Sequence, residues 1–322
     1  MRALRFHKVG SLDELKVEEL PRPIPAAGEV LIQVKAAAIN PSDVKNVQGK
    51  MHETSLPRIP GRDFAGIVVE GPGDLSGQLV FGSGGNLGFG RDGSHAEFVA
   101  VPASAVLPLP KNLSFEQAAG IGVAYITAWA ALVITAEIKS GETALILGTT
   151  GAVGGAAASI AHSLGARVIG TVRQASEIPA ADVLPVEKWI DLESADLAAT
   201  VREVTEGKGV EVVFDVVGGA IFEKCLAALA WRGRQVSISS SPDPRVSFNL
   251  VDFYHNESRL FGLDSLKLSF DETAEILRQL TPGIEAGKFP PPQVETFPLD
   301  DGPRLYKDIA ASKLKRRPIL IP

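Results

Sequence analysis

The chain has 322 residues, of which 45% are hydrophobic and 22% are charged, a composition typical of a folded globular protein with room for two domains. Its formal net charge of −6 provides no basic face for a nucleic-acid backbone, so DNA or RNA binding is not expected. Cys225 is the only cysteine, which excludes an intramolecular disulfide and a thiolate zinc cluster and favours a reducing, cytoplasmic setting.

The first third of the chain predicts a mostly antiparallel, barrel-like β domain. Runs rich in β-branched residues alternate there with Pro and Gly, which separate strands from turns. The predicted strands are residues 1–10, 29–39, 65–71, 78–82 and 95–102.

Residues 117–136 carry no charged side chain and are just long enough to span a bilayer. Their many Ala, Gly and Thr residues make them a weak insertion signal. We therefore expect a buried helix near a domain junction and no membrane segment.

From about residue 140 predicted strands alternate with predicted helices, a pattern that indicates βαβ units and a parallel sheet. The expected strands are residues 143–148, 167–172, 210–217, 234–239 and 259–264, and the expected helices are residues 153–165, 195–207, 220–230 and 271–288. A last strand at 318–322 has no helix after it, and we predict that it returns to the first domain.

Residues 143–172 read as strand, glycine turn, small-residue helix and strand, which is the length of one βαβ unit. Glycines at such a turn allow a pyrophosphate to approach the backbone, and the helix N-terminus directs free N–H groups at it. The alternative is a purely structural turn. We predict that the cofactor is bound by Gly148, Thr150, Gly151, Ala152, Val153 and Gly154.

The end of the second strand of this unit bears on the choice of dinucleotide. Sites specific for NADH carry an acidic residue about 20 positions beyond the glycines, but none occurs here between Gly154 and Glu177. Thr171 and Arg173 instead present a hydroxyl and a guanidinium, which suit a 2′-phosphate. We therefore expect NADPH, with a solvated strand-end charge as the alternative role of Arg173.

Several further strings, in this order, closely resemble the medium-chain dehydrogenase/reductase superfamily, in particular its zinc-less quinone oxidoreductase branch, which includes zeta-crystallin-like proteins. They are INPSD at 39–43, IPGRDFAG at 59–66, GSHAEF at 93–98, YITAW at 125–129 and FDVVGG at 214–219. The resemblance runs over essentially the whole chain.

The resemblance implies an α/β fold in which a Rossmann domain, a doubly wound parallel sheet, is inserted in a GroES-like domain. Residues 1–122 and 265–322 would form the GroES-like catalytic domain, and residues 123–264 the Rossmann NADPH-binding domain. The active site would lie in the cleft between them. Family members are usually homodimers or homotetramers joined through their Rossmann sheets.

The resemblance also implies that no metal takes part. Asn40 stands where zinc-dependent relatives have a cysteine ligand, and Arg62 and Asp63 stand where they have a His-Glu pair. The five histidines lack the spacing of zinc ligands. A carbonyl must then be polarised by hydrogen-bond donors, which favours an activated acceptor such as a quinone or enone.

By the same resemblance Asn40, Asp43 and Lys45 line the catalytic cleft, with Asn40 and Lys45 as donors to the substrate oxygen and Lys45 as proton donor. The alternatives are a loop-capping Asn40, a structural Asp43 paired to Arg62 and a solvated Lys45. Further cofactor contacts are implied for Thr127, Val217, Ser239, Phe261, Gly262 and Leu263. Leu192 departs from relatives that carry a tyrosine for the 2′-phosphate.

The expected function is zinc-independent transfer of a hydride from NADPH to quinones or related conjugated carbonyl compounds. An alkenal or enoyl-thioester double-bond reductase is one alternative, and a non-catalytic NADPH-binding regulatory protein is another. The basic cluster Lys313, Lys315, Arg316 and Arg317 is predicted to form a solvated tail.

Overall fold

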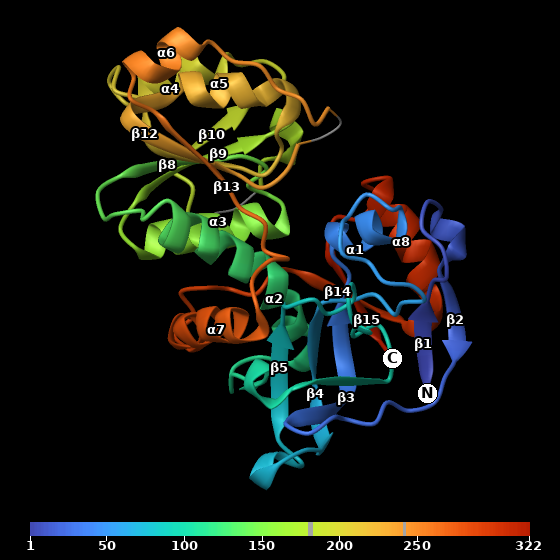
Figure 1. The fold of residues 1–322 in the computed structure, drawn as a ribbon. Coiled ribbons are helices and arrows are strands. Elements are labelled where there is room, and N and C mark those ends of the chain that lie inside the picture. The colour runs from blue at the N-terminus through green and yellow to red at the C-terminus, as the bar shows by residue number, and fades with distance from the viewer. Residues whose placement is uncertain (180–182, 241–242) are drawn as a thin grey trace. The chain divides into compact units, whose positions relative to one another are not determined.

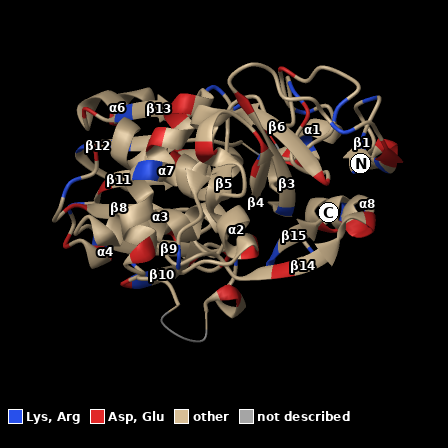
Figure 2. Ribbon diagram, turned by 90° about the horizontal axis from the view of Figure 1, so that it is seen from below, with Lys and Arg blue, Asp and Glu red and all other residues tan. Residues whose placement is uncertain are grey.

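The computed structural model describes residues 1–179, 183–240 and 243–322. These residues form two units, one made of Met1–Ile126 with Ser265–Pro322 and the other of Thr127–Asp264. The sequence predicted the first boundary at 122/123 and the second at 264/265. Lys and Arg are interspersed with Asp and Glu along the ribbon of both units (Figure 2).

The first unit is built on a largely antiparallel sheet. Its strands, in the order of pairing, are β14 (Val294–Pro298), β15 (Arg317–Ile321), β3 (Glu29–Ala38), β4 (Asp63–Glu70), β5 (Leu79–Ser83) and β7 (Leu107–Pro108), with β6 (Phe98–Pro102) on β3. A separate hairpin joins β1 (Arg2–Arg5) to β2 (Lys16–Glu19). Four helices accompany the strands: α1 (Pro41–Val47), α2 (Phe115–Trp129), α7 (Phe270–Glu285) and α8 (Gly302–Ala310).

The last strand returns to the first domain, as predicted. Ile319 of β15 pairs with Ala38 of β3 in antiparallel register, and β14 pairs with β15 in parallel. The strands β3 and β15 are almost wholly buried because their apolar side chains face the cores on both sides of the sheet.

The second unit is a six-stranded parallel sheet in the described residues. Its order is β10 (Lys188–Asp191), β9 (Arg167–Val172), β8 (Thr143–Ile146), β11 (Val210–Asp215), β12 (Leu229–Ser237) and β13 (Arg259–Gly262). Figure 1 shows α3 (Ala152–Ser163) on one face and α4 (Leu197–Val204), α5 (Phe222–Ala227) and α6 (Leu250–His255) on the other. The strand order is that of the Rossmann fold, which confirms the predicted fold class.

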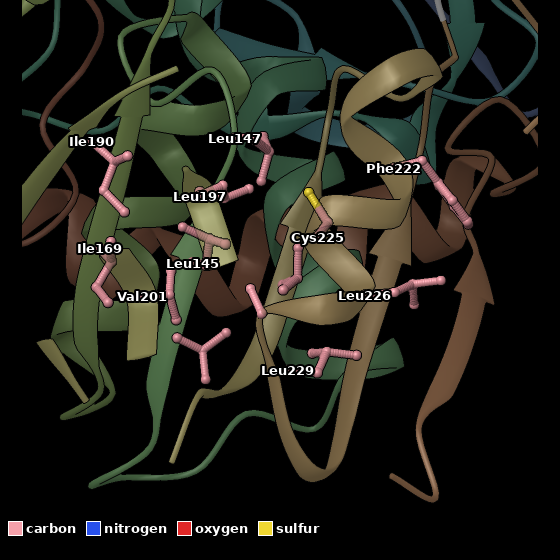
Figure 3. Packing of buried hydrophobic residues seen from close by; sticks show 13 residues of the cluster. Leu145, Leu147, Ile169, Ile190, Leu197, Val201, Phe222, Cys225, Leu226 and Leu229 are labelled. Atoms are coloured by element: carbon pink, nitrogen blue, oxygen red, sulfur yellow. The ribbon is translucent and has the colours of Figure 1, made fainter. Parts of the chain in front are cut away.

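The core of this unit lies between the sheet and the α4–α5 layer. Leu145 and Ile169 project from the strands toward Val201 of α4 and Cys225 of α5 (Figure 3). Burial raises the pKa of the Cys225 thiol well above its usual value, so this cysteine remains a neutral core residue.

The uncharged segment forms the buried helix predicted for it. The segment Phe115–Thr135 comprises α2 and a π-helical turn at Ala130–Thr135, and it is long and apolar enough to cross a membrane. However, 78% of its most apolar window is buried inside the fold, which is the property of a core helix.

Several short elements were not predicted from the sequence. They are β2, α1, β7, β10, α6, β14 and α8, which span two to nine residues each. Elements this short show too few periods of hydrophobic alternation to be distinguished from loops.

Candidate functional site

The glycine turn of the second unit leads directly into α3. The helix begins at Ala152 with Gly151 as its N-cap, and no side chain caps it. The first N–H groups of a helix have no partner within it. Thr150 and Gly151 are exposed and Ala152 and Val153 are partly exposed, so the start of the helix is open to solvent where an anion would approach.

Gly154 is required by the packing of helix against turn. A Cβ added at this position would lie 2.3 Å from the carbonyl oxygen of Gly148. At Gly155, the next residue, a Cβ would make only ordinary van der Waals contacts, the nearest with Leu184 Cδ2 at 3.4 Å. Therefore only one of the two adjacent glycines has to lack a side chain.

Two threonine hydroxyls hold the turn in place. Thr149 Oγ1 donates to the carbonyl of Ile146 and accepts from the Thr171 amide, at 2.7 and 2.8 Å. Thr171 Oγ1 in turn accepts from the Gly148 amide at 3.2 Å, and Thr171 is fully buried. The hydroxyl of Thr171 thus faces the glycine turn from the neighbouring strand.

Arg173 follows β9 and is exposed, but its guanidinium is engaged. Its Nε and Nη2 donate to Glu177 Oε1 at 3.0 and 2.6 Å, and its amide donates to Glu177 Oε2 at 3.3 Å. The cation expected to suit a 2′-phosphate is therefore paired with a carboxylate four residues later.

The loop after β11 is ordered by a buried carboxylate. Asp215 accepts from the amides of Val217 and Gly218 at 2.9 and 2.8 Å, and burial raises the pKa of its carboxyl. A Cβ on Gly218 would lie 2.3 Å from the carbonyl oxygen of Ser239. Consequently Val217 and Ser239, from adjacent strand ends, belong to neighbouring loops.

The cofactor residues predicted after β8, β9, β11, β12 and β13 all follow or end those strands. In a parallel sheet these are carboxyl ends, so they lie along one edge. The chain order reverses at β8, which has β9 on one side and β11 on the other. This reversal is the place where open α/β sheets bind ligands.

Phe261, Gly262 and Leu263 close the row at β13, where Leu263 N donates to Ser237 O. Thr127 lies apart from this row, buried in the last turn of α2.

In the first unit, Asn40 belongs to a buried polar cluster. Its Nδ2 donates to Asp63 Oδ2 at 3.0 Å, and its Oδ1 accepts from Arg317 Nη2 at 2.6 Å. Arg317 Nη2 also donates to Asp63 Oδ2 at 2.9 Å. Each of the three residues thus contacts the other two, and none is more than 9% exposed.

Asp63 is the centre of this cluster. Its other oxygen, Oδ1, accepts from Ser83 Oγ at 2.5 Å and from the Val123 amide at 2.8 Å. The carboxylate is fully buried, and these donors satisfy it.

Helix α2 is broken where it meets Asp63. Gly122 has φ −17° and ψ −108°, and a Cβ there would lie 2.1 Å from Asp63 Oδ1. The carboxylate therefore receives the amide of Val123, the first residue after the break, as an N-cap residue would.

Asp43 stabilises the start of α1. Its Oδ2 accepts from the Asn40 backbone amide at 2.8 Å in a capping box. Burial raises the pKa of the Asp43 carboxyl to about 7. Lys45 lies two residues further along α1 and is half-buried.

Two residues of this region were missed or misjudged by sequence reasoning. Arg317 was predicted to lie in a solvated tail, and this prediction is wrong: Arg317 is 9% exposed, whereas Lys313, Lys315 and Arg316 are exposed. The signal that identifies it is its position as the first residue of β15. For Asp63, sequence reasoning predicted only that it replaces a metal ligand and missed its contacts with Asn40 and Arg317.

His95, which belongs to the GSHAEF string, is fully buried next to β3. Its Nε2 lies 3.1 Å from the carbonyl oxygen of Ala38, so Nε2 carries the proton, and Nδ1 accepts from the Tyr306 hydroxyl at 2.8 Å. Burial lowers the pKa of the His95 imidazole to about 4. His95 is therefore a neutral core residue, as expected for a histidine without ligand spacing.

Comparisons with known proteins agree with this geometry. Residues 152–281 match the family model of zinc-binding dehydrogenases, and residues 26–111 match the alcohol dehydrogenase GroES-like domain. A zinc-type alcohol dehydrogenase-like protein of Schizosaccharomyces pombe is 37% identical over 293 residues, covering 90% of this chain and 86% of that protein. The quinone oxidoreductase of Homo sapiens is 27% identical over 311 residues, covering 96% and 94%. The crystal structure of Escherichia coli quinone oxidoreductase complexed with NADPH has a TM-score of 0.87 at 28% identity, covering 100% of both chains.

The residues at the zinc positions do not fit a zinc ion. An amide and a carboxylate replace the usual ligand set, and both accept a hydrogen bond from Arg317, whose guanidinium stays protonated. A dication at these oxygens would meet that fixed positive charge. Elsewhere in the described residues, no three His, Cys, Asp or Glu side chains form a group suited to a metal.

Proposed function

The chain belongs to the medium-chain dehydrogenase/reductase superfamily, in its zinc-less quinone oxidoreductase branch, and on this premise we propose that it is an NADPH-dependent reductase of quinones or related conjugated carbonyl compounds. It is an oxidoreductase by family. The acceptor, the cofactor and a soluble, cytoplasmic setting are the parts that we propose.

One observation carries the proposal: the predicted cofactor residues of five strands follow a single edge of the sheet, at its topological switch point. The turn at Gly148–Gly154 would hold the pyrophosphate on the first N–H groups of α3, which no side chain caps. Arg173 at the end of β9 would face the 2′-phosphate. Val217, Ser239 and Phe261–Leu263 would contact the part of the cofactor that extends beyond the switch point.

NADPH, when bound, supplies the hydride. Reduction of a quinone to a hydroquinone consumes that hydride and one proton and leaves NADP⁺. We assign the proton to Lys45, a half-buried residue of α1. A second donor to the substrate oxygen is Asn40 Nδ2, which has two N–H bonds and directs one of them at Asp63.

In this proposal Asp43 and Asp63 act on the donors and not on the substrate. Asp43 caps α1 and thereby fixes the turn from which Lys45 extends. Asp63 and Arg317 bind the Nδ2 and Oδ1 atoms of the Asn40 side-chain amide, so the orientation of this amide is set before a substrate arrives. Such preorganisation is the main way in which hydrogen-bond donors contribute to catalysis.

The test is oxidation of NADPH and NADH by the purified, chelator-treated chain with a panel of quinones, alkenals and enoyl thioesters. We expect NADPH oxidation with quinones, one NADPH per hydroquinone formed. Preferred turnover of an alkenal or enoyl thioester, with a product reduced at the carbon–carbon double bond, would favour that alternative. Tight NADPH binding without any turnover would support a regulatory protein and refute the proposed reaction.

Two lysine variants test the proton donor. Lys45→Met removes the ammonium group, and general acid catalysis typically contributes at least about 100-fold, so we expect kcat to fall by that order. Lys50→Met, at an exposed residue five positions later, is the matched control and should retain its activity. Equal activity of both variants would exclude Lys45 as the donor.

We also propose that the protein forms a homodimer or homotetramer through its Rossmann unit. Within the described residues β13 is one of the two edge strands of the sheet, and Leu260 on it is 40% exposed. Large apolar side chains nearby in sequence are exposed as well, on α6 (Leu250, Val251 and Tyr254) and on β12 (Trp231). An unpaired edge with exposed apolar residues is suited to a second copy of the same strand.

A further inference from the structure

We infer that Glu177 controls the preference of this protein between NADPH and NADH, because its carboxylate competes with the 2′-phosphate of NADPH for Arg173. The inference rests on the proposed function, since it assumes that a dinucleotide binds at the edge formed by β8 and β9. It identifies Glu177 as a determinant of the choice between NADPH and NADH, in addition to the predicted phosphate-binding turn.

The contact between the two residues is extensive for a surface pair. Glu177 Oε1 accepts from both Nε and Nη2 of Arg173, and Oε2 accepts from the Arg173 amide. A 3₁₀ turn at Ala175–Glu177, directly after β9, folds the carboxylate back onto the strand end. The pair is therefore built into the local backbone and does not depend on a distant element.

Arg173 is the natural partner for a 2′-phosphate at this place. It is the sole charged residue of the sequence between positions 168 and 176. The Thr171 hydroxyl, which was the other candidate, is buried and already accepts from the Gly148 amide. The attraction for a 2′-phosphate at the end of β9 thus depends on Arg173, whose guanidinium is already paired with the Glu177 carboxylate.

The exposure of the two side chains allows the exchange. The Arg173 side chain is 78% exposed and the Glu177 side chain 24%, so an incoming phosphate reaches the guanidinium from solvent. An exposed pair of this kind is weakly bound and is displaced by a dianion. NADH has no phosphate at this position, and it gains nothing by separating the pair.

The sign of the effect follows from these charges. Binding of NADPH must break the pair and place its phosphate near a carboxylate, and both costs vanish in Glu177→Gln. For NADH neither cost exists. In addition, the Glu177 carboxylate can accept a hydrogen bond from the ribose 2′-hydroxyl of NADH. Its removal in Glu177→Gln therefore gives NADH no gain in affinity.

The experiment measures dissociation constants of NADPH, NADH and 2′,5′-ADP by calorimetry on the full chain. In Glu177→Gln we expect NADPH and 2′,5′-ADP to bind about fivefold more tightly, with NADH changed less than twofold. The matched control is Glu187→Gln. It removes a carboxylate that is paired with Arg167 in the same way, at the opposite end of β9, and should change none of the three constants.

A second variant, Arg173→Gln, tests whether Glu177 acts through Arg173. Arg173→Gln should weaken NADPH, and adding Glu177→Gln to it should produce no further gain. An unchanged ratio of NADPH to NADH affinity in Glu177→Gln, or an equal gain in Glu187→Gln, overturns the inference while the proposed function stands. Absence of binding of either dinucleotide to the natural protein overturns both.

Discussion

Arg317 Nη2 donates to Asp63 Oδ2 at 2.9 Å, although 254 positions separate the two residues in the chain. The bond joins β15, at the end of the chain, to β4 of the first unit. Both side chains are almost completely buried, at 6% and 0% exposure, so each charge depends on the other.

Removing either partner should strongly destabilise the fold. We expect Asp63→Asn and Arg317→Met each to lower the free energy of unfolding by about 3–5 kcal/mol, because each leaves a buried charge uncompensated. Urea denaturation followed by circular dichroism measures this. The double variant should cost less than the sum of the two changes.

Arg316 provides the control for that experiment, because it is adjacent in sequence but exposed. Arg316→Met should shift the urea midpoint little, as surface substitutions do. If Arg316→Met and Arg317→Met had the same midpoint, the buried pair would not contribute to stability.

The two adjacent glycines of α3 should respond oppositely to alanine. In Gly154→Ala the new methyl group must displace the Gly148 carbonyl, so we expect a loss of about 1–3 kcal/mol and at least tenfold weaker NADPH binding. In Gly155→Ala, where space exists, the higher helix propensity should stabilise the protein by about 0.5–1 kcal/mol. Thermal unfolding and calorimetric titration with NADPH measure both quantities, and weaker binding in both variants would contradict the prediction.

The pH dependence of stability should reveal two buried groups that act in opposite directions. The pKa of Asp43 is raised from 3.8 to about 7, so its contribution is fully present below pH 3.8 and is lost as the pH rises toward 7. The pKa of His95 is lowered from 6.5 to about 4, so its contribution is fully present above pH 6.5 and is lost as the pH falls toward 4.

Asp43→Asn separates these two effects. The amide cannot ionise and can still accept from the Asn40 amide, so the His95 contribution remains alone. Relative to the natural protein, the variant should become more stable as the pH rises from 4 to 7, by at most about 1.4 kcal/mol per pH unit. Urea titrations at several pH values measure the difference, which should not be constant; a constant difference would mean that Asp43 titrates normally.

The edge strand of the second unit should determine the oligomeric state. Leu260→Lys places a charge on β13, and charged edge residues oppose strand pairing. We expect analytical ultracentrifugation to show a multimer for the natural protein and a monomer for this variant. Leu79→Lys is the matched control, since Leu79 is a similarly exposed leucine on β5 of the other unit. The assembly proposal fails if Leu260→Lys retains the mass of the natural protein.

The parallel sheet and its glycine turn were predictable because their signals are local. Strands at residues 143–146 and 167–172 are short apolar runs, and between them Gly148 has a positive φ and Gly154 lies where a Cβ would clash with the Gly148 carbonyl. The resemblance to a family then supplied the arrangement of domains. Short elements such as α1 and β14 were missed, since a few residues carry too little periodicity.

The sequence by itself determined the class of fold and the position of the glycine turn and, through its resemblance to a family, the residues that stand at the zinc positions, because each depends on residue types within a short stretch. Only the tertiary structure decided that Arg317 joins Asn40 and Asp63, because this contact requires strands from opposite ends of the chain to pair side by side. It likewise decided that Arg173 is paired with Glu177. Charge and spacing are visible in a sequence, but which partner neutralises a charge depends on backbone direction and burial.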